Sequence, residues 1–274
     1  MFKDKSSEFC FFNDEIKLFS DIDSKIFEGS GELVYEVIKM IDGKPLFWED
    51  HIDRIYLSFE KIGVNLAIDK EIFEKGATKI VEKDQMLNNN IKIVIGKFSD
   101  HINILIYNIK SKYPSDLLKK SGVKVKPFNY ERLNPGAKLI NLDYKREISN
   151  FISENDLFEA ILVDHNGFVT EGSRSNIFFI KDNNIYTPRS SDVLLGITRM
   201  KLLELFRLLD LKVAEFDVEL DSVGDYDGVF LSGTSINVLA VESIGEKAFS
   251  TPNNNIYKLI HDNFENMILE HTYW

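Results

Sequence analysis

Cysteine is nearly absent from this chain of 274 residues, since Cys10 is the only one. A single cysteine cannot form an intramolecular disulfide, so nothing points to an oxidising compartment, and the cytoplasm is the expected location. Histidines are also few, five in all, and they are scattered along the chain. None of them forms a metal-ligand cluster with Cys10, and no metal is expected.

Long apolar runs are missing as well. Charged residues from Lys3 to Glu15 interrupt the N-terminal segment, which therefore holds neither a signal-peptide core nor a membrane-spanning helix. Basic residues number 33 against 44 acidic ones, and the net charge of -11 argues against broad binding to nucleic acid. Apolar residues still make up 44% of the chain, so we expect a soluble protein with a packed core.

Residues 1–120 predict an α+β domain. Apolar segments on either side of Asp42-Gly43 predict a β-hairpin, and apolar residues at helical spacing follow from His51 to Ile62. Arg54 falls in the first turn of this helix, where its residue type alone favours a solvated surface side chain. Further elements are expected as a helix over residues 70–85 and strands over 91–95 and 102–109.

Residues 121–134 are expected to link this domain to the next, because turn-forming residues interrupt the pattern there, although the alternating Val123 and Val125 predict a strand within the segment. Residues 135–274 predict a larger α/β domain that binds the cofactor, so that the whole chain has a two-domain α/β fold. The expected elements are a helix to about Glu154, strands over 159–163, 176–180, 184–186, 211–218 and 229–231, and helices over 200–209 and 254–271.

Four short signatures occur in a fixed order in the second domain. They are Lys138 before a helix-like run, Thr170-Glu171-Gly172, Gly196-Ile197-Thr198-Arg199 and Ser232-Gly233-Thr234-Ser235. A lysine can hold a carbonyl compound as a Schiff base, and a buried glutamate can hold a protonated ring nitrogen. Hydroxyl-bearing turns at two helix starts can hold a phosphate. Together these groups match the needs of pyridoxal 5′-phosphate.

Each signature has a commoner explanation when it is taken alone. Lys138 could be a surface lysine with a snorkelling stem, although its apolar flanks would favour a neutral amine. Glu171 could be a solvated carboxylate at the end of a strand. The two hydroxyl-bearing turns could be simple helix caps, and Thr198 is a natural N-cap residue.

As an ordered set, these signatures resemble the class IV pyridoxal phosphate aminotransferases over about residues 29–244. The motifs that carry the resemblance are Val34-Tyr35-Glu36-Val37-Ile38-Lys39, His51-Ile-Asp-Arg54, Lys138-Leu-Ile-Asn141, the run from Asn166 to Phe178, Leu194-Leu-Gly-Ile-Thr198-Arg and Ser232-Gly-Thr234. The resemblance implies a homodimer of two-domain α/β subunits, with the cofactor in the cleft between the domains.

The resemblance also implies roles for single residues. Lys138 would be the Schiff-base lysine, which also moves the proton between the substrate α-carbon and the cofactor. Glu171 would hold the pyridine nitrogen, and Leu194 would pack behind the ring. The implied phosphate cup consists of Arg54, Ile197, Thr198 and Thr234, and Ser235 is included among the expected cofactor-binding residues.

The motifs are closest to D-amino acid transaminase, but the substrate residues depart from each pattern. Where that enzyme has a carboxylate-binding arginine, this chain reads Ile93 to Lys97. Where branched-chain enzymes have a tyrosine, it has Leu142, and the threonine of aminodeoxychorismate lyase corresponds to Val37 or a neighbour. The expected substrate-binding residues are Tyr35, Lys39, Lys97 and Arg174, of which the last two are candidates for pairing with a substrate carboxylate.

The sequence therefore predicts a pyridoxal phosphate-dependent transaminase that exchanges an amino group between an amino acid and a 2-oxo acid. A D-amino acid is slightly favoured over a branched-chain one. Two alternatives stay open: a lyase that releases pyruvate from aminodeoxychorismate, and a catalytically silent relative that binds a phosphorylated metabolite.

Overall fold

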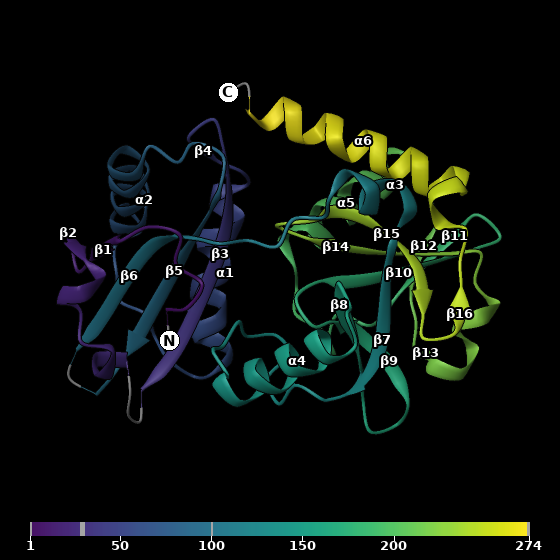
Figure 1. The fold of residues 1–274 in the computed structure, drawn as a ribbon, viewed down its shortest axis with the longest axis horizontal. Coiled ribbons are helices and arrows are strands. Elements are labelled where there is room, and N and C mark those ends of the chain that lie inside the picture. Colours follow the sequence, from purple (N-terminus) through teal and green to yellow (C-terminus); the bar gives the residue numbers. More distant parts are fainter. Residues whose placement is uncertain (1, 28–30, 100, 273–274) are drawn as a thin grey trace. The chain divides into compact units, whose positions relative to one another are not determined.

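A computed structural model describes residues 2–27, 31–99 and 101–272 (Figure 1). The chain forms two compact units. The first runs to Lys112 and also includes Ala137–Ile140 and the end of the chain from His271. The second comprises Tyr113–Gly136 and Asn141–Glu270. Mixed sheets and helices confirm the expected α/β class.

The first unit contains a six-stranded sheet in the order β2-β1-β6-β5-β3-β4. Its elements are β1 (Phe9–Phe12), β2 (Glu15–Leu18), β3 (Glu32–Ile41), β4 (Lys44–Pro45), β5 (Asn90–Lys97), β6 (Ile102–Ile109), helices α1 (Trp48–Lys61) and α2 (Glu71–Asp84), and the short 3₁₀ helices η1 (Phe19–Asp21) and η2 (Ser24–Phe27). The hairpin around Asp42-Gly43 is confirmed, with the positive φ values of 50° and 79° that a tight β-turn of this kind needs.

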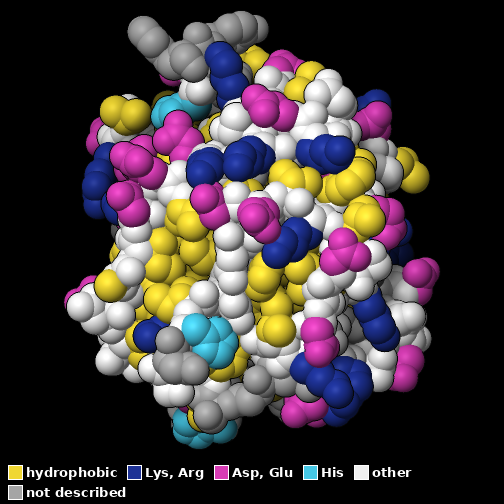
Figure 2. All heavy atoms as spheres, turned by 90° about the vertical axis from the view of Figure 1, so that its left-hand side faces the viewer, with side chains coloured by type: hydrophobic (Ala, Val, Ile, Leu, Met, Phe, Trp, Pro, Cys, Tyr) yellow, Lys and Arg dark blue, Asp and Glu magenta, His cyan; other side chains and the backbone are white. Residues whose placement is uncertain are grey.

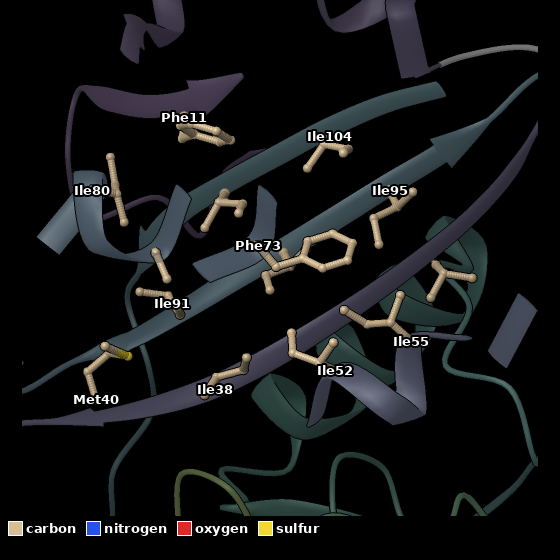
Figure 3. Close-up of a cluster of buried hydrophobic side chains, with 14 of the residues drawn as sticks. Phe11, Ile38, Met40, Ile52, Ile55, Phe73, Ile80, Ile91, Ile95 and Ile104 are labelled. Atoms are coloured by element: carbon tan, nitrogen blue, oxygen red, sulfur yellow. The ribbon is translucent and has the colours of Figure 1, made fainter. Parts of the chain in front are cut away.

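The main core of this unit lies between one face of the sheet and the helices α1 and α2. Strand β3 alternates strictly, with Val34, Ile38 and Met40 buried on the core side. They share one buried cluster with Ile52 and Ile55 of α1, and Figure 3 shows Ile38 next to Ile52. The predicted helical spacing of α1 is thus the spacing of residues that contact the sheet.

The segment Ala137–Ile140 belongs to this first unit although it lies far along the chain. Leu139 forms an antiparallel bridge with Val34 of β3. The carbonyl oxygen of Lys138 accepts a hydrogen bond from Tyr35 N at 3.0 Å, and Ile140 N donates to the Leu33 oxygen at 2.9 Å. Lys138 therefore lies beside β3.

The second unit contains a ten-stranded sheet in the order β12-β11-β10-β14-β15-β7-β8-β9-β13, with β16 paired to β15. Its strands are β7 (Val123–Asn129), β8 (Glu159–Val163), β9 (Phe168–Gly172), β10 (Asn176–Lys181), β11 (Asn184–Thr187), β12 (Val213–Glu215), β13 (Val218–Glu219), β14 (Gly228–Gly233), β15 (Asn237–Ile244) and β16 (Lys247–Ala248). Its helices are α3 (Asp116–Ser121), α4 (Leu142–Glu154), α5 (Ile197–Leu208) and α6 (Asn255–Thr272), with 3₁₀ helices η3 (Leu220–Asp225) and η4 (Thr251–Asn253).

Aromatic stacking holds α5 against this sheet. The rings of Phe178 on β10 and Phe230 on β14 are stacked, with centroids 5.0 Å apart. Phe206 of α5 meets Phe178 edge to face at 5.7 Å. The last turn of α5 is therefore held against β10 and β14.

Three expectations differ from the structure. The segment expected as a linker, residues 121–134, carries β7, which pairs in parallel with both β15 and β8 inside the sheet. Its alternating Val123 and Val125 are buried, which explains why it is a strand of the sheet. No helix begins at Ser232-Gly-Thr-Ser: these residues end β14 and turn directly into β15. Gly196, not Thr198, is the N-cap of α5.

Charged side chains of both signs are mixed on the face of the molecule in Figure 2, with apolar side chains visible between them. Among the residues that the structure describes, no helix is both long enough and apolar enough to cross a membrane. Over the same residues, His, Cys, Asp and Glu side chains form no group of three or more that could hold a metal ion.

Candidate active site

Lys138 is held by its backbone on two sides and lies against an aromatic ring. Its amide nitrogen donates a hydrogen bond to Ser58 Oγ of α1 at 3.2 Å, and its carbonyl oxygen is bonded to Tyr35 N of β3. Its Nζ lies 4.8 Å from the centre of the Tyr35 ring. The residue is half-buried, and the Tyr35 ring forms one apolar wall beside the amine.

Arg54 is buried, with 6% of its surface exposed, so the solvated side chain expected from its residue type is wrong. Its Nε donates to Glu36 Oε2 at 2.8 Å, and its Nη2 donates to Oε1 at 2.6 Å. Val37 N also donates to Oε1 at 2.8 Å, and His51 Nδ1 lies 3.2 Å from the same oxygen. The guanidinium of Arg54 is therefore held in one orientation by a two-point ion pair.

Burial and charge act in opposite directions on this cluster. Burial alone would raise the pKa of Glu36, but the adjacent Arg54 guanidinium, helped by His51, outweighs it and holds this pKa well below its usual range. Burial lowers the pKa of His51, against the pull of the Glu36 carboxylate. Glu36 is therefore ionised near pH 7, with Arg54 as its counter-ion.

Glu171 ends up buried at the end of β9, with 3% of its surface exposed. Its Oε2 accepts hydrogen bonds from Asn176 Nδ2 at 3.3 Å and Leu194 N at 3.2 Å. Its Oε1 forms an ion pair with Arg132 Nε at 2.6 Å. The guanidinium of Arg132 in turn lies 5.2 Å from the ring centre of Tyr144. A buried, oriented carboxylate of this kind suits a protonated ring nitrogen.

The first turn of α5 brings two predicted cup residues together. Ile197 and Thr198 are its first residues and both are buried, and Gly196 caps the helix without a side-chain hydrogen bond. Amide groups at a helix start attract anions. Beyond the helix, the hydroxyls of Ser175 and Ser232 are buried and have no hydrogen-bond partner within the described ranges.

Those two orphan hydroxyls bear on whether a phosphorylated cofactor fits. Ser232 lies directly opposite Asn176 in the β10–β14 ladder, so their side chains share one face of the sheet. Asn176 is the residue that binds Glu171, and it also donates to Leu194 O at 2.8 Å. A phosphate needs donors such as buried hydroxyls and the N–H groups of a helix start, and a protonated ring nitrogen needs a buried carboxylate. The residues of the second unit therefore fit pyridoxal phosphate.

Thr234 and Ser235 lie in the turn between β14 and β15, both half-buried. The turn is closed by a hydrogen bond from Ile236 N to Gly233 O at 3.1 Å. Because β10 and β14 are neighbours, this turn follows directly from Ser232, the residue opposite Asn176. A hairpin turn, rather than a helix start, carries this signature.

Arg199, the last residue of the third signature, anchors α5. It is 1% exposed. Its guanidinium donates to Pro188 O, Glu215 Oε1 and Ser190 Oγ at 3.1–3.2 Å. These contacts tie the start of α5 to β12 and to the loop after β11, a structural role that explains this arginine without a ligand.

The expected substrate residues are divided between the units. Tyr35 and Lys39 lie on β3 and Lys97 ends β5, all in the first unit, and only Tyr35 is placed against Lys138. Lys97 pairs in register with Glu32 of β3. Arg174, in the second unit, is exposed and donates from Nη2 to Phe158 O at 2.9 Å.

The sequence analysis gave no role to several residues of the site, namely Glu36, His51 and Asn176, which lie within its motifs, and Ser58 and Arg132, which do not. One of them had a visible signal: Glu36 occupies an inward position between Val34 and Ile38 in the alternation of β3, where a charged residue needs a buried partner. Arg132 and Ser58 gave no signal, because their partners are distant in the sequence.

The comparison with protein families decides what kind of protein carries this geometry. The model of the class IV amino-transferases matches residues 33–244, a stretch that includes Arg54, Lys138, Glu171 and Thr234. The chain belongs to the class IV aminotransferases. The resemblance predicted from the motifs is confirmed, and so is the assignment as an aminotransferase. Enzymes of this class depend on pyridoxal phosphate.

Relatives of this class IV aminotransferase span almost the same length. It is 29% identical over 256 residues to a D-alanine aminotransferase of Bacillus licheniformis, covering 88% of this chain and 89% of that one. It is 26% identical over 227 residues to a probable branched-chain-amino-acid aminotransferase of Rickettsia bellii, covering 77% of each chain.

Solved structures share the fold of this class IV aminotransferase. The branched-chain amino acid aminotransferase from Escherichia coli superposes with a TM-score of 0.80 at 20% identity, covering 96% of this chain and 94% of that one. A Legionella pneumophila structure, described as a candidate 4-amino-4-deoxychorismate lyase, superposes with a TM-score of 0.76 at 23% identity, covering 89% and 94%. At these identities the likeness concerns the fold alone.

Proposed function

We propose that this aminotransferase uses pyridoxal 5′-phosphate to move an amino group between an amino acid and a 2-oxo acid. A D-amino acid or a branched-chain amino acid is the proposed donor, because relatives of both kinds match most of the chain. We further propose that it works in the cytoplasm as a homodimer. The observation that carries the proposal is that the family match covers residues 33–244, the stretch that holds Lys138 and Glu171.

When bound, the cofactor would supply a carbonyl carbon that receives the amino group and a ring that accepts the electrons of the broken α-C–H bond. Lys138 Nζ is proposed to hold the cofactor and to carry the α-proton. The Glu171 carboxylate is proposed to keep the proton on the ring nitrogen. This carboxylate is held in place by hydrogen bonds from Asn176 and from Leu194 N and by the ion pair with Arg132.

The proposed phosphate ligands are Arg54 from the first unit and Ile197, Thr198, Thr234 and Ser235 from the second. Arg54 supports this role because Glu36 orients its guanidinium. Ile197 and Thr198 support it through the start of α5, where backbone N–H groups favour an anion. Leu194 is proposed to pack behind the ring, and its backbone also binds Glu171.

A direct test compares the wild type with Lys138→Ala. After pyridoxal 5′-phosphate is added, we expect a visible absorption band in the wild type and its loss in the variant. Borohydride should then attach the cofactor permanently to Lys138, detectable by peptide mass spectrometry. A wild type that shows neither the band nor the adduct would contradict the proposal and favour a silent phosphometabolite-binding relative.

The substrate is tested with D- and L-amino acids offered against two 2-oxo acids. Transfer of the amino group to the oxo acid is expected. The lyase alternative, for which the Legionella structure is the supporting fold relative, predicts instead that pyruvate is released from aminodeoxychorismate without any acceptor acid.

A further inference from the structure

Ser58 is completely buried, and its hydroxyl joins two functional segments of the first unit. It lies one turn after Arg54 on α1 and donates a hydrogen bond from Oγ to Arg54 O at 2.8 Å. The same oxygen accepts the hydrogen bond from Lys138 N at 3.2 Å. One serine therefore connects the helical turn of Arg54 to the backbone of Lys138.

The two bonds use the hydroxyl in complementary ways. A serine hydroxyl has one hydrogen to donate and two lone pairs that can accept. Because Arg54 O takes the hydrogen, a lone pair of Oγ is oriented toward the Lys138 amide. The position of Oγ itself is set by α1, whose Ile55 and Phe59 are packed in the core on either side of Ser58 in the sequence.

Lys138 is thereby anchored on both sides of its α-carbon. Its amide side is bonded to Ser58 of α1, and its carbonyl side is bonded to Tyr35 N of β3. The next residues continue along β3, through the Leu139–Val34 bridge. Without Ser58, the Lys138 N–H would lose this acceptor, and the hydrogen bond between Ser58 and the amide side of the residue would be gone.

We propose that Ser58 is a positioning residue for Lys138, which fixes the backbone from which the reactive amine extends and ties it to the turn of α1 that carries Arg54. This inference rests on the proposed function, in which Lys138 captures the cofactor. Capture joins Nζ of Lys138 to the aldehyde carbon of pyridoxal 5′-phosphate and releases the aldehyde oxygen as water. Its rate depends on where the amine is held, since a misplacement of about 1 Å can slow a reaction by roughly a hundredfold.

The test measures two properties of Ser58→Ala. The first is the rate at which Lys138 captures pyridoxal 5′-phosphate, followed by borohydride trapping at timed intervals and mass spectrometry. The second is the affinity for pyridoxamine 5′-phosphate, which has the same ring and phosphate but no aldehyde to react. We expect capture to slow by roughly ten- to a hundredfold while the affinity for pyridoxamine 5′-phosphate stays at the wild-type value.

The chain offers a matched control in Ser149→Ala. Ser149 Oγ also donates to the carbonyl oxygen one helical turn earlier, Lys145 O at 2.6 Å on α4, but it is exposed and bonds no lysine amide in the described structure. This control should capture the cofactor at the wild-type rate. Ser58→Thr keeps the hydroxyl and should restore at least part of the rate.

Equal capture rates in Ser58→Ala and wild type would overturn the inference. So would a parallel loss of capture and of pyridoxamine 5′-phosphate affinity, because that is the result of general structural damage. If Ser58→Ala does not fold, as judged by circular dichroism, the same two measurements are made on Ser58→Cys. Cysteine is similar in size to serine but a weak acceptor, so slower capture with unchanged affinity for pyridoxamine 5′-phosphate is expected again. A wild type that captures nothing at Lys138 would contradict the proposed function instead.

Discussion

The Arg132 guanidinium lies against the Glu171 carboxylate, with Nε 2.6 Å from Oε1. Glu171 has 3% of its side chain exposed and Arg132 has 22%, so this ion pair is largely shielded from water. Arg132 comes from the connection between β7 and α4, and its Nη2 also donates to Ser173 O at 3.3 Å. The proposed partner of the ring nitrogen therefore has a cation of the protein itself as its neighbour.

We expect Arg132→Gln to destabilise the cofactor-free protein, because it leaves the charge of Glu171 buried without its nearest cation. Breaking a shielded pair from one side costs about 2 kcal/mol or more. Urea unfolding of the cofactor-free protein measures this loss. In a Glu171→Gln background the amide carries no charge, so the same Arg132→Gln change should cost much less.

Arg146→Gln is the control for this comparison of the two backgrounds, since Arg146 is 70% exposed and pairs with the exposed Asp143 on its own helix. Its free energy of unfolding should stay near that of the wild type. If Arg132→Gln cost the same in both backgrounds, Arg132 would act through Tyr144 and Ser173 and not through Glu171.

Gly196→Ala tests the packing that orients Asn176. A Cβ at position 196 would lie 2.2 Å from Asn176 Oδ1, so the amide would have to move away from Leu194 O and Glu171. We expect a loss of about 1–3 kcal/mol in stability and a weaker affinity for pyridoxamine 5′-phosphate. Gly224→Ala is the control, because a Cβ there meets only the flexible side chain of Lys247. Titration calorimetry measures the affinity of Gly196→Ala and of Gly224→Ala for pyridoxamine 5′-phosphate. Equal affinities in the two variants would refute this role for Gly196.

Glu36→Gln should change how stability depends on pH. The pKa of Glu36 is held below its usual value of 4.5, against burial, mainly by Arg54. A carboxyl whose pKa is depressed by folding stabilises the protein fully above its unfolded value and loses that contribution as the pH falls through its folded value. The wild type should therefore be the more stable protein at neutral pH, and the gap to Glu36→Gln should narrow below about pH 4.5.

Chemical unfolding at a series of pH values measures that gap. Both proteins are measured in a His51→Asn background, because Glu36→Gln removes the carboxylate that raises the pKa of His51, and the titration of this imidazole would otherwise differ between the two proteins. A gap that stayed constant down to about pH 3 would mean that the ionisation of Glu36 does not contribute to stability in this range.

Elements with a strong apolar period were predictable from the sequence. Helix α1 and strand β3 bury the residues that their spacing selects, because local periodicity and tertiary packing agree there. The alternation of Val123 and Val125 in β7 predicted a strand, but the segment around it was assigned to a linker between the domains. Its place inside the sheet follows from pairing with β15 and β8, which joins distant segments and leaves no local signal.

The residues of the candidate site also fall into those that could be predicted from the sequence and those that could not. Lys138, Glu171 and Thr198 belong to ordered motifs that the sequence displays directly. Their supports Ser58 and Arg132 do not, because each acts through a partner far along the chain. The Ser232 to Ser235 signature was recognisable, but its shape was not, since serine, glycine and threonine suit hairpin turns as well as helix starts.

The last prediction concerns the cation for the substrate carboxylate, for which Arg174 and Lys97 are the two candidates. Arg174 is exposed, and its Nη2 contact with the neutral Phe158 carbonyl leaves its charge available to an anion. Its backbone N–H, which donates to Glu159 Oε1 at 2.5 Å, would survive truncation of the side chain. We expect Arg174→Ala to raise KM for both the amino acid and the 2-oxo acid by about tenfold, with little change in kcat. Lys97→Met is the matched comparison, because Lys97 is the other candidate cation and lies opposite Glu32 in the register of the β3–β5 ladder. Steady-state kinetics with both substrates distinguishes them: an unchanged KM in Arg174→Ala together with a raised KM in Lys97→Met would move the assignment to Lys97.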